Sequence, residues 1–218
     1  MRPTCYGDLL KAGYRRDIDF QVVIGNRQNV RRCLLVAPHG GGIEPMTSEV
    51  TRAVAIVGAR SFYLFEGLLS RNNWNAFHIS STSFDEPDFE VLVEKTALVV
   101  AFHGAERDGG RNIYVGGLHE EGRRLMVEAL NAVLRQLGIL AVDATDGAVA
   151  ESISGLHPRN LTNRGQTGRG IQLEFSVGAR LVFFPGKSRT ERHPNEHLAL
   201  LAESIDDVLG QVISRNGS

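Results

Sequence analysis

Two uninterrupted apolar runs constrain the fold of this chain more than any other feature. Residues 33–37 and 96–102 carry no charged side chain, and each run is followed within two residues by a histidine and then a glycine. A strand without polar alternation is buried on both faces, which is typical of a central strand in a parallel sheet. Because parallel strands are joined by helical crossovers, these runs predict an α/β fold.

The remaining pattern predicts strands and helices in alternation. Residues 170–176 alternate apolar and polar side chains, as a strand does. The other expected strands are residues 20–24, 61–65, 76–79, 112–115 and 181–184. The expected helices run from a cap at Thr47 or Ser48 to about residue 59, over residues 119–137 with Gly138 ending the helix, and onward from Pro194. We predict a single α/β domain over residues 1–218, with a mixed, mostly parallel sheet covered by helices on both faces.

Composition argues against two classes of binding partner, nucleic acids and membranes. The 218 residues have a formal net charge of −1, whereas a general nucleic-acid binder is usually basic. No segment reaches the roughly 18 uncharged apolar residues of a membrane span, and the charged first twenty residues lack the apolar core of a signal peptide. Cys5 and Cys33 are too few for a disulfide framework. We therefore expect neither a nucleic-acid nor a membrane partner. We expect the protein to be made in the cytosol, and its release on lysis stays open.

The two histidines at strand ends predict a metal site. His39 is followed by Gly40, Gly41 and Gly42 and then by Glu44, without the Gly-Lys-Ser/Thr ending of a phosphate loop. His103 follows the second apolar run, and ligand sites in open α/β sheets lie at the carboxyl ends of strands. Zinc takes imidazole nitrogen and carboxylate oxygen, and a catalytic zinc has three protein ligands. We expect His39, Glu44 and His103 to bind one zinc ion.

A zinc hydrolase also needs a general base near the attacking water. Glu174 is the first candidate, because it lies on the polar face of a strand whose other face is apolar, and a carboxylate there is costly unless it faces a polar site. Glu66 and Glu49 remain alternatives. His78, in the expected strand 76–79, either lines the site or is a hydrogen-bonded histidine of the sheet.

Local charge predicts where an anionic substrate binds. Residues 155–193 contain seven basic and two acidic residues, a local excess of +5 in a chain of net charge −1. Arginine forks bind carboxylates through two hydrogen bonds. Asn163, Arg164 and Arg169 lie on the segment that leads to Glu174, so we expect them to bind substrate; a solvated basic surface is the alternative. The basic residues concerned are Arg159, Arg164, Arg169, Arg180, Lys187, Arg189 and Arg192.

These motifs, in this order, resemble the phage-type poly-γ-glutamate hydrolase family. The resemblance spans roughly residues 17–185 and rests on the segments 38–44, 63–67, 78–87, 103–104, 114–117, Asn160 with 163–164, and 172–174. It implies a fold like that of the zinc carboxypeptidases, one zinc ion and cleavage of γ-glutamyl amide bonds. It also implies His39, Glu44 and His103 as ligands and Glu174 as the base. Zinc carboxypeptidases have His-x-x-Glu, whereas four residues separate His39 from Glu44 here.

The expected reaction is hydrolysis of poly-γ-glutamate. Glu174 would deprotonate a zinc-bound water, and Arg164 would stabilise the oxyanion or bind a free α-carboxylate. Two alternatives stay open: a zinc amidohydrolase or deformylase that acts on an N-acylated acidic amino acid, and a non-catalytic polyanion-binding protein. A serine hydrolase is disfavoured, because the chain has no Gly-x-Ser-x-Gly motif. The sequence predicts neither the oligomeric state nor the mode of cleavage.

Overall fold

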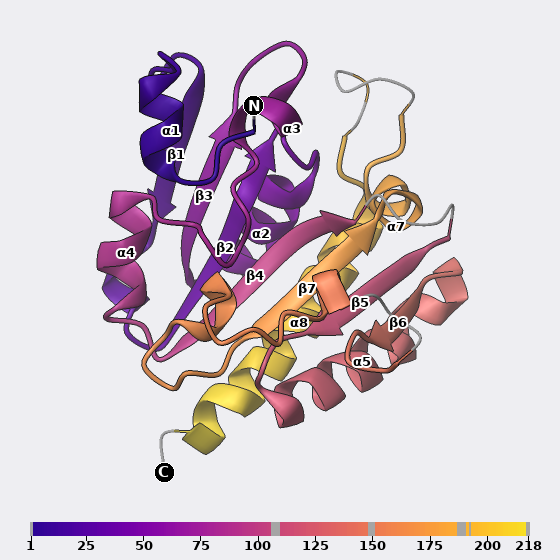
Figure 1. Ribbon diagram of the computed structural model, residues 1–218. Helices are drawn as coiled ribbons and strands as arrows, with labels where there is room; N and C mark the ends of the chain where they lie inside the picture. The colour runs from indigo at the N-terminus through magenta and orange to yellow at the C-terminus, as the bar shows by residue number, and fades with distance from the viewer. Residues whose placement is uncertain (1, 106–109, 148–150, 187–190, 192, 217–218) are drawn as a thin grey trace.

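A seven-stranded sheet forms the centre of the computed structural model, which describes residues 2–105, 110–147, 151–186, 191 and 193–216 (Figure 1). The strand order is β1-β3-β2-β4-β7-β5-β6. The strands are β1 (Phe20–Gly25), β2 (Cys33–Gly41), β3 (Ser61–Gly67), β4 (Leu98–Ala105), β5 (Asn112–Gly116), β6 (Leu140–Asp143) and β7 (Ile171–Ser176). Strands β3, β2, β4 and β7 are mutually parallel, while β1 pairs antiparallel with β3 and β5 pairs antiparallel with β7 and parallel with β6. The prediction of a mixed, mostly parallel sheet is confirmed.

Helices cover both faces of this sheet, as predicted. One face packs against α2 (Thr47–Val57), α5 (Glu120–Leu134), α7 (Val177–Phe183) and α8 (Glu196–Asn216). The other face packs against α1 (Tyr6–Lys11), α3 (Asn73–Phe77), α4 (Pro87–Val93) and the short helix η3 (Leu161–Asn163). The remaining elements are η1 (Arg27–Asn29), η2 (Arg135–Leu137) and α6 (Glu151–Ser154).

Successive residues of the two central strands enter opposite cores. Leu35 and Val100 belong to the cluster under α2, α5 and α8, whereas Leu34 and Val99 belong to the cluster under α3 and α4. All four side chains are fully buried. This arrangement explains why the two apolar runs lack polar alternation, because neither face of either strand meets water.

Two predicted strands are helices. Residues 76–79 overlap α3, and residues 181–184 overlap α7. Ser176 ends β7 and its hydroxyl accepts a hydrogen bond from the backbone N–H of Ala179 at 3.2 Å, so the chain enters a helix at once. Short apolar runs do not distinguish a strand from a buried helical turn.

Other boundaries differ in smaller ways. Strand β6 was not predicted, and β2 and β4 continue beyond their histidines, so His39 and His103 lie within the strands. Thr47 and Ser48 lie inside α2, whose N-cap is Met46 without a side-chain cap. Gly138 does end the η2 turn after α5, in the left-handed conformation at φ 70°. Cys5 and Cys33 are free thiols. Among the described helices, none has both the length and the apolar character to cross a membrane.

Candidate functional site

His39, His103 and Glu174 come from three adjacent strands at the carboxyl edge of the parallel part of the sheet. His103 of β4 pairs in register with Glu174 of β7, and β2 carries His39 alongside β4. All three side chains are buried. This is the edge at which α/β sheets bind ligands, as the sequence predicts.

A tight turn returns Glu44 to the same place. Gly41 has φ +62°, and a Cβ there would lie 2.6 Å from the carbonyl oxygen of Gly67, so only glycine fits. The backbone N–H of Glu44 donates to the carbonyl of His39 at 2.7 Å. The glycines after His39 therefore bring a carboxylate beside the imidazole that precedes them.

The three predicted ligands face one another. His39 Nδ1 lies 3.0 Å from Glu44 Oε1 and 3.2 Å from His103 Nδ1, and His103 Nδ1 lies 3.5 Å from Glu44 Oε2. Two nitrogen donors and one carboxylate at these separations suit a first-row divalent cation. The cluster is also charge-coupled, because the imidazoles of His39 and His103 overcome the effect of burial and hold the pKa of Glu44 well below its usual range.

Outer contacts fix the orientation of these side chains. The carbonyl of Ile79 can only accept, so His39 Nε2 donates to it at 2.7 Å and Nδ1 is the ring nitrogen that faces the cluster. The backbone N–H of Gly104 donates to Glu44 Oε2 at 2.8 Å. Nδ1 of His39 and Oε1 of Glu44 therefore face each other, and either a proton or a metal cation can lie between them.

A third imidazole lies at the same place. His78 Nε2 is 3.7 Å from Glu44 Oε1, and His39, Glu44 and His78 each offer a ligand atom within 4.8 Å of the others. The His78 ring stacks between His39, at 4.1 Å between centroids, and Trp74, at 3.8 Å. Burial, together with the neighbouring His39, lowers the pKa of His78 to about 3, so this ring is neutral. Two overlapping ligand sets therefore share His39 and Glu44.

Glu174 is a buried carboxyl group next to this cluster. Burial is the main cause that raises its pKa, to about 8, with a contribution from Glu44, while His103 and Arg180 act in the opposite direction. The side-chain amide of Gln172 donates to Glu174 Oε1 at 2.9 Å, and Asn160 Nδ2 donates to Gln172 Oε1 at 2.9 Å. The polar side of β7 thus carries a chain of amides that ends at the carboxyl group.

These groups line one cavity of about 380 Å³. His39, Glu44, His78 and Glu174 lie on its wall together with Trp74 and Asn160. A cavity of this size with a few convergent polar groups is typical of a small-molecule or chain-end site. The other acids considered from the sequence lie elsewhere: Glu66 accepts from Gln21 Nε2 at 2.6 Å, and Glu49 is exposed on α2.

The structure does not bring the predicted substrate-binding loop to this cavity. Arg164 donates to the carbonyl of Phe84 at 2.7 Å, pairs with Glu90 and stacks over Phe89. Arg169 lines a different cavity, with His119. Lys187, Arg189 and Arg192 of the basic stretch lie outside the described residues.

Asn163 is buried, and the hydrogen bonds of its side chain go to backbone groups. It accepts from the backbone N–H groups of Leu118 and Gly170, both at 3.1 Å. It donates to the carbonyls of Gly155 at 2.7 Å and His157 at 3.1 Å. These four bonds use the capacity of an amide side chain, so Asn163 holds the loop together.

Arg180 is the arginine that the sequence analysis did not single out. It comes from α7, is 3% exposed, and donates from Nη1 to the carbonyl of Pro45 at 2.7 Å. Its guanidinium lies against Gly104, where a Cβ would be 2.8 Å from Cζ, so the glycine after His103 makes room for it. Arg180 is thus a buried cation close enough to Glu174 to lower the pKa of that carboxyl group.

Comparison with known proteins gives consistent results. The family model described as poly-gamma-glutamate hydrolase matches residues 7–208. Two Bacillus subtilis (strain 168) proteins are similar: UPF0714 protein YmaC, 37% identical over 159 residues, and the SPbeta prophage-derived UPF0714 protein YoqZ, 32% identical over 183 residues. The matches cover 73% and 81% of this chain, and the chain spans 63% of each relative's length.

Two solved structures share the fold along nearly the whole chain. A bacteriophage poly-gamma-glutamate hydrolase superposes with a TM-score of 0.84 at 30% identity, covering 98% of both chains. A zinc-free apo form of YndL superposes with a TM-score of 0.81 at 32% identity, covering 96% of this chain and 98% of the other. The resemblance drawn from the motifs is confirmed by these matches.

Proposed function

The chain belongs to the poly-gamma-glutamate hydrolase family, and from this premise we propose that it is a zinc-dependent hydrolase that cleaves the γ-glutamyl amide bonds of poly-γ-glutamate. The observation that carries this proposal is the mutual contact of His39, Glu44 and His103 beside the cavity that His39, Glu44 and the buried Glu174 line. The zinc-free description of the YndL structure supports the choice of metal.

Ring orientation favours His39, Glu44 and His103 as the ligand set. Tetrahedral zinc with bonds of about 2.0–2.2 Å places its ligand atoms about 3.3–3.6 Å apart. The separations of 3.0, 3.2 and 3.5 Å and the 3.7 Å between His78 and Glu44 all lie near that spacing, so distance does not choose between the two sets. The rings of His39 and His103 are inclined by 61°, which lets their in-plane lone pairs converge on one point, whereas the rings of His39 and His78 are inclined by only 31°. We propose that His78 lines the substrate site and keeps the His39 ring in place.

When bound, zinc would polarise the scissile carbonyl and make water acidic enough to attack near neutral pH. The chain itself supplies the proton transfers. Glu174 takes a proton from the attacking water and delivers it to the nitrogen of the departing amine. Its burial beside an amide donor keeps it in one orientation and excludes bulk water, which would otherwise compete for the same proton.

Positive charge next to the reaction centre comes from Arg180 in this proposal, in place of the predicted Arg164. The guanidinium of Arg180 lies against Gly104, one residue after His103, and its charge favours the ionised form of Glu174. A fixed cation also stabilises negative charge that develops on the substrate oxygen. Arg164 instead donates to the carbonyl of Phe84 and pairs with Glu90 of α4.

Chain-length analysis of the polymer tests the function. Poly-γ-glutamate is incubated with zinc-loaded protein, with protein treated with a chelator, and with treated protein to which zinc is restored, and gel filtration follows its length. We expect shortening in the first and third samples only. Binding without shortening in all three would identify a non-catalytic polyanion-binding protein. Activity on an N-formylated acidic amino acid, but not on the polymer, would identify an amidohydrolase of small substrates.

A further inference from the structure

A larger cavity lies at the opposite edge of the sheet from the candidate site. Its volume is about 590 Å³, and it is bordered by the start of β4 at Leu98 and by Gly210 and Ile213 of α8. Leu98 pairs with Cys33, the first residue of β2, so the cavity lies at the amino ends of the strands whose carboxyl ends carry His39 and His103. No residue of the mechanism above contributes to it.

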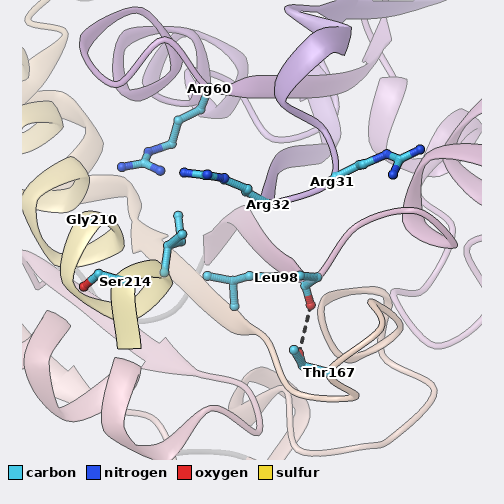
Figure 2. Close-up of a pocket in the computed structure, with 9 residues that line it drawn as sticks. Arg31, Arg32, Arg60, Leu98, Thr167, Gly210 and Ser214 are labelled. Atoms are coloured by element: carbon cyan, nitrogen blue, oxygen red, sulfur yellow. Dashed lines mark hydrogen bonds between the residues drawn. The ribbon is translucent and has the colours of Figure 1, made fainter. Parts of the chain in front are cut away.

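Arginine side chains give this cavity a positive charge, which the ion pair of Arg60 with Asp206 reduces. Three arginines and no acidic residue line it, and Figure 2 shows Arg32 and Arg60 extending toward each other while Arg31 extends away. Asp206 orients Arg60, whose Nε donates to the Asp206 carboxylate and whose Nη2 donates to its backbone carbonyl at 3.2 Å. In the part of the chain that the structure describes, the Arg32 side chain has no ion pair or hydrogen bond. Two guanidinium groups that face each other attract an anion between them.

Part of the cavity lining is apolar. Ala97 and Ile213 are partly exposed there, whereas Leu98 is 2% exposed and belongs to the core beneath them. A simple inorganic anion would use the guanidinium groups and leave this apolar part unused. A chain in which carboxylates alternate with methylene groups would contact both, because methylenes gain from contact with apolar surface.

We propose that this cavity is a second, non-catalytic binding site for poly-γ-glutamate, in which Arg32 and Arg60 bind carboxylates of the polymer and the partly exposed Ala97 and Ile213 contact its methylene groups. The proposal rests on the proposed function, since it takes the polymer as the substrate. It predicts that the protein holds a long chain at two places.

Because the cavity lies away from the candidate active site, its contribution to polymer binding should depend on the length of the polymer. Leu98 and His103 lie five residues apart on strand β4, which at about 3.3 Å per residue separates the two sites by roughly 17 Å. A long polymer can occupy both sites at once, and the second contact then raises the effective concentration of the chain at the first. A short oligomer occupies only one.

Arg32→Ala tests the site without disturbing the fold, because the side chain is exposed and the hydrogen bonds of Arg32 to Asn29 and Leu98 are made by its backbone. In zinc-loaded enzyme, we expect the KM for long polymer to rise about five- to tenfold while kcat, and the KM for short γ-glutamyl oligomers, stay unchanged. In an inactive Glu174→Gln background, fluorescence anisotropy of labelled polymer should show a Kd weaker by the same factor.

Arg135→Ala is the control. Arg135 is an exposed arginine of η2, outside the cavity lining, and its side chain bonds to Asn131 of α5. Arg31 also lines the cavity but points away from Arg60, so Arg31→Ala should weaken binding less than Arg32→Ala. Equal weakening by Arg135→Ala would show diffuse surface charge and overturn the proposal. Displacement of the polymer by inorganic phosphate alone would show a small-anion site and also overturn it, as would an unchanged Kd in Arg32→Ala.

The same experiment separates this proposal from the proposed function. If zinc-loaded protein leaves the polymer intact, hydrolysis fails, and the anisotropy measurement still decides whether Arg32 binds the chain. If the polymer is shortened and Arg32→Ala has the KM and the Kd of the parent protein, hydrolysis stands and the second site is overturned.

Discussion

The side-chain amide of Gln172 donates a hydrogen bond of 2.9 Å to Glu174 Oε1, from the same side of strand β7. This contact opposes burial, because a donor stabilises the carboxylate form and lowers its pKa. Gln172 is in turn held by Asn160, whose Nδ2 donates to Gln172 Oε1 at 2.9 Å. The base proposed for hydrolysis is therefore positioned by two amides, Gln172 and Asn160, that are not among the proposed metal ligands.

Replacement of Gln172 by methionine tests this positioning. The variant keeps the volume and removes the donor, so the pKa of Glu174 should rise and less of the active carboxylate should form. We expect kcat to fall about tenfold and the acidic limb of the pH–rate profile to move to higher pH, since outer contacts of this kind change activity by about 10–100-fold. Gln166→Met, at an exposed glutamine bonded to Glu94, is the control and should leave both unchanged. A lower kcat with an unmoved acidic limb would indicate a purely structural role for Gln172.

Glu174→Gln separates a base from a ligand. The amide cannot accept the proton of water, so kcat should fall by roughly 10²–10⁴, which is the usual size of a general base contribution. Zinc content should remain near one equivalent, because the proposed ligands are untouched. An empty metal site in this variant, measured by elemental analysis, would reassign Glu174 as a ligand.

His103→Ala and His78→Ala distinguish the two ligand sets. If His39, Glu44 and His103 hold zinc, then His103→Ala loses the metal while His78→Ala retains it. Trp74 reports the same event, because it is the one tryptophan of the chain and stacks on His78, next to the cluster. Zinc titration followed by Trp74 fluorescence should respond in the parent protein and not in His103→Ala. The opposite pattern of metal content would select the set with His78.

The two arginines predict opposite phenotypes. Arg164→Ala removes contacts to Phe84 and Glu90 on a partly exposed surface, so we expect a loss of roughly 1 kcal/mol of stability and little change in kcat. Arg180→Lys keeps the charge and loses the planar fork that lies against Gly104, so kcat should fall about tenfold with zinc retained. Thermal unfolding and steady-state rates measured on both variants check this. A large loss of kcat in Arg164→Ala would restore the role that the sequence suggested.

Much of the sheet could be predicted because its central strands are buried on both sides. The uninterrupted apolar runs at residues 33–37 and 96–102 require strands that are buried on both faces. Such strands are parallel, and parallel neighbours end at a common edge of the sheet. The proximity of His39 and His103 could therefore be predicted from their positions at the ends of these two strands. The glycines after His39 suggested a turn, and the return of Glu44 follows from it.

The recognition residues could not be predicted in the same way. Charge counting found a basic segment but not the direction of its side chains, and Arg164 pairs with an acid on α4 that is distant in sequence. Arg180 was overlooked because residues 181–184 resemble a strand by composition, whereas a helix carries that side chain back over β4. Side-chain direction depends on the element type, and four apolar residues do not determine it.

His119 should make the folding stability depend on pH, and a substitution at this residue can separate its contribution from that of the other histidines. Its Nδ1 accepts a hydrogen bond of 3.0 Å from the backbone N–H of Gly122 and so caps α5, which requires the neutral ring. Burial and the nearby Arg169 lower its pKa below the ordinary 6.5. Between the ordinary pKa of 6.5 and the lower pKa in the folded state, the folded protein binds fewer protons than the unfolded chain. The contribution of His119 to stability is therefore fully present above pH 6.5 and is lost as the pH falls below it.

His119→Asn keeps a capping acceptor and removes the titration. We expect the Tm of the parent protein to fall more steeply than that of the variant between pH 7 and pH 5, by roughly 2–4 °C for each 1 kcal/mol of cap energy lost. The difference between the two curves isolates His119 from the other six histidines, which both proteins share. Curves that stay parallel would mean that protonation of His119 leaves the cap intact. Gly122 lies against Ile171 of β7, so a loosened cap would also disturb the strand that carries Glu174.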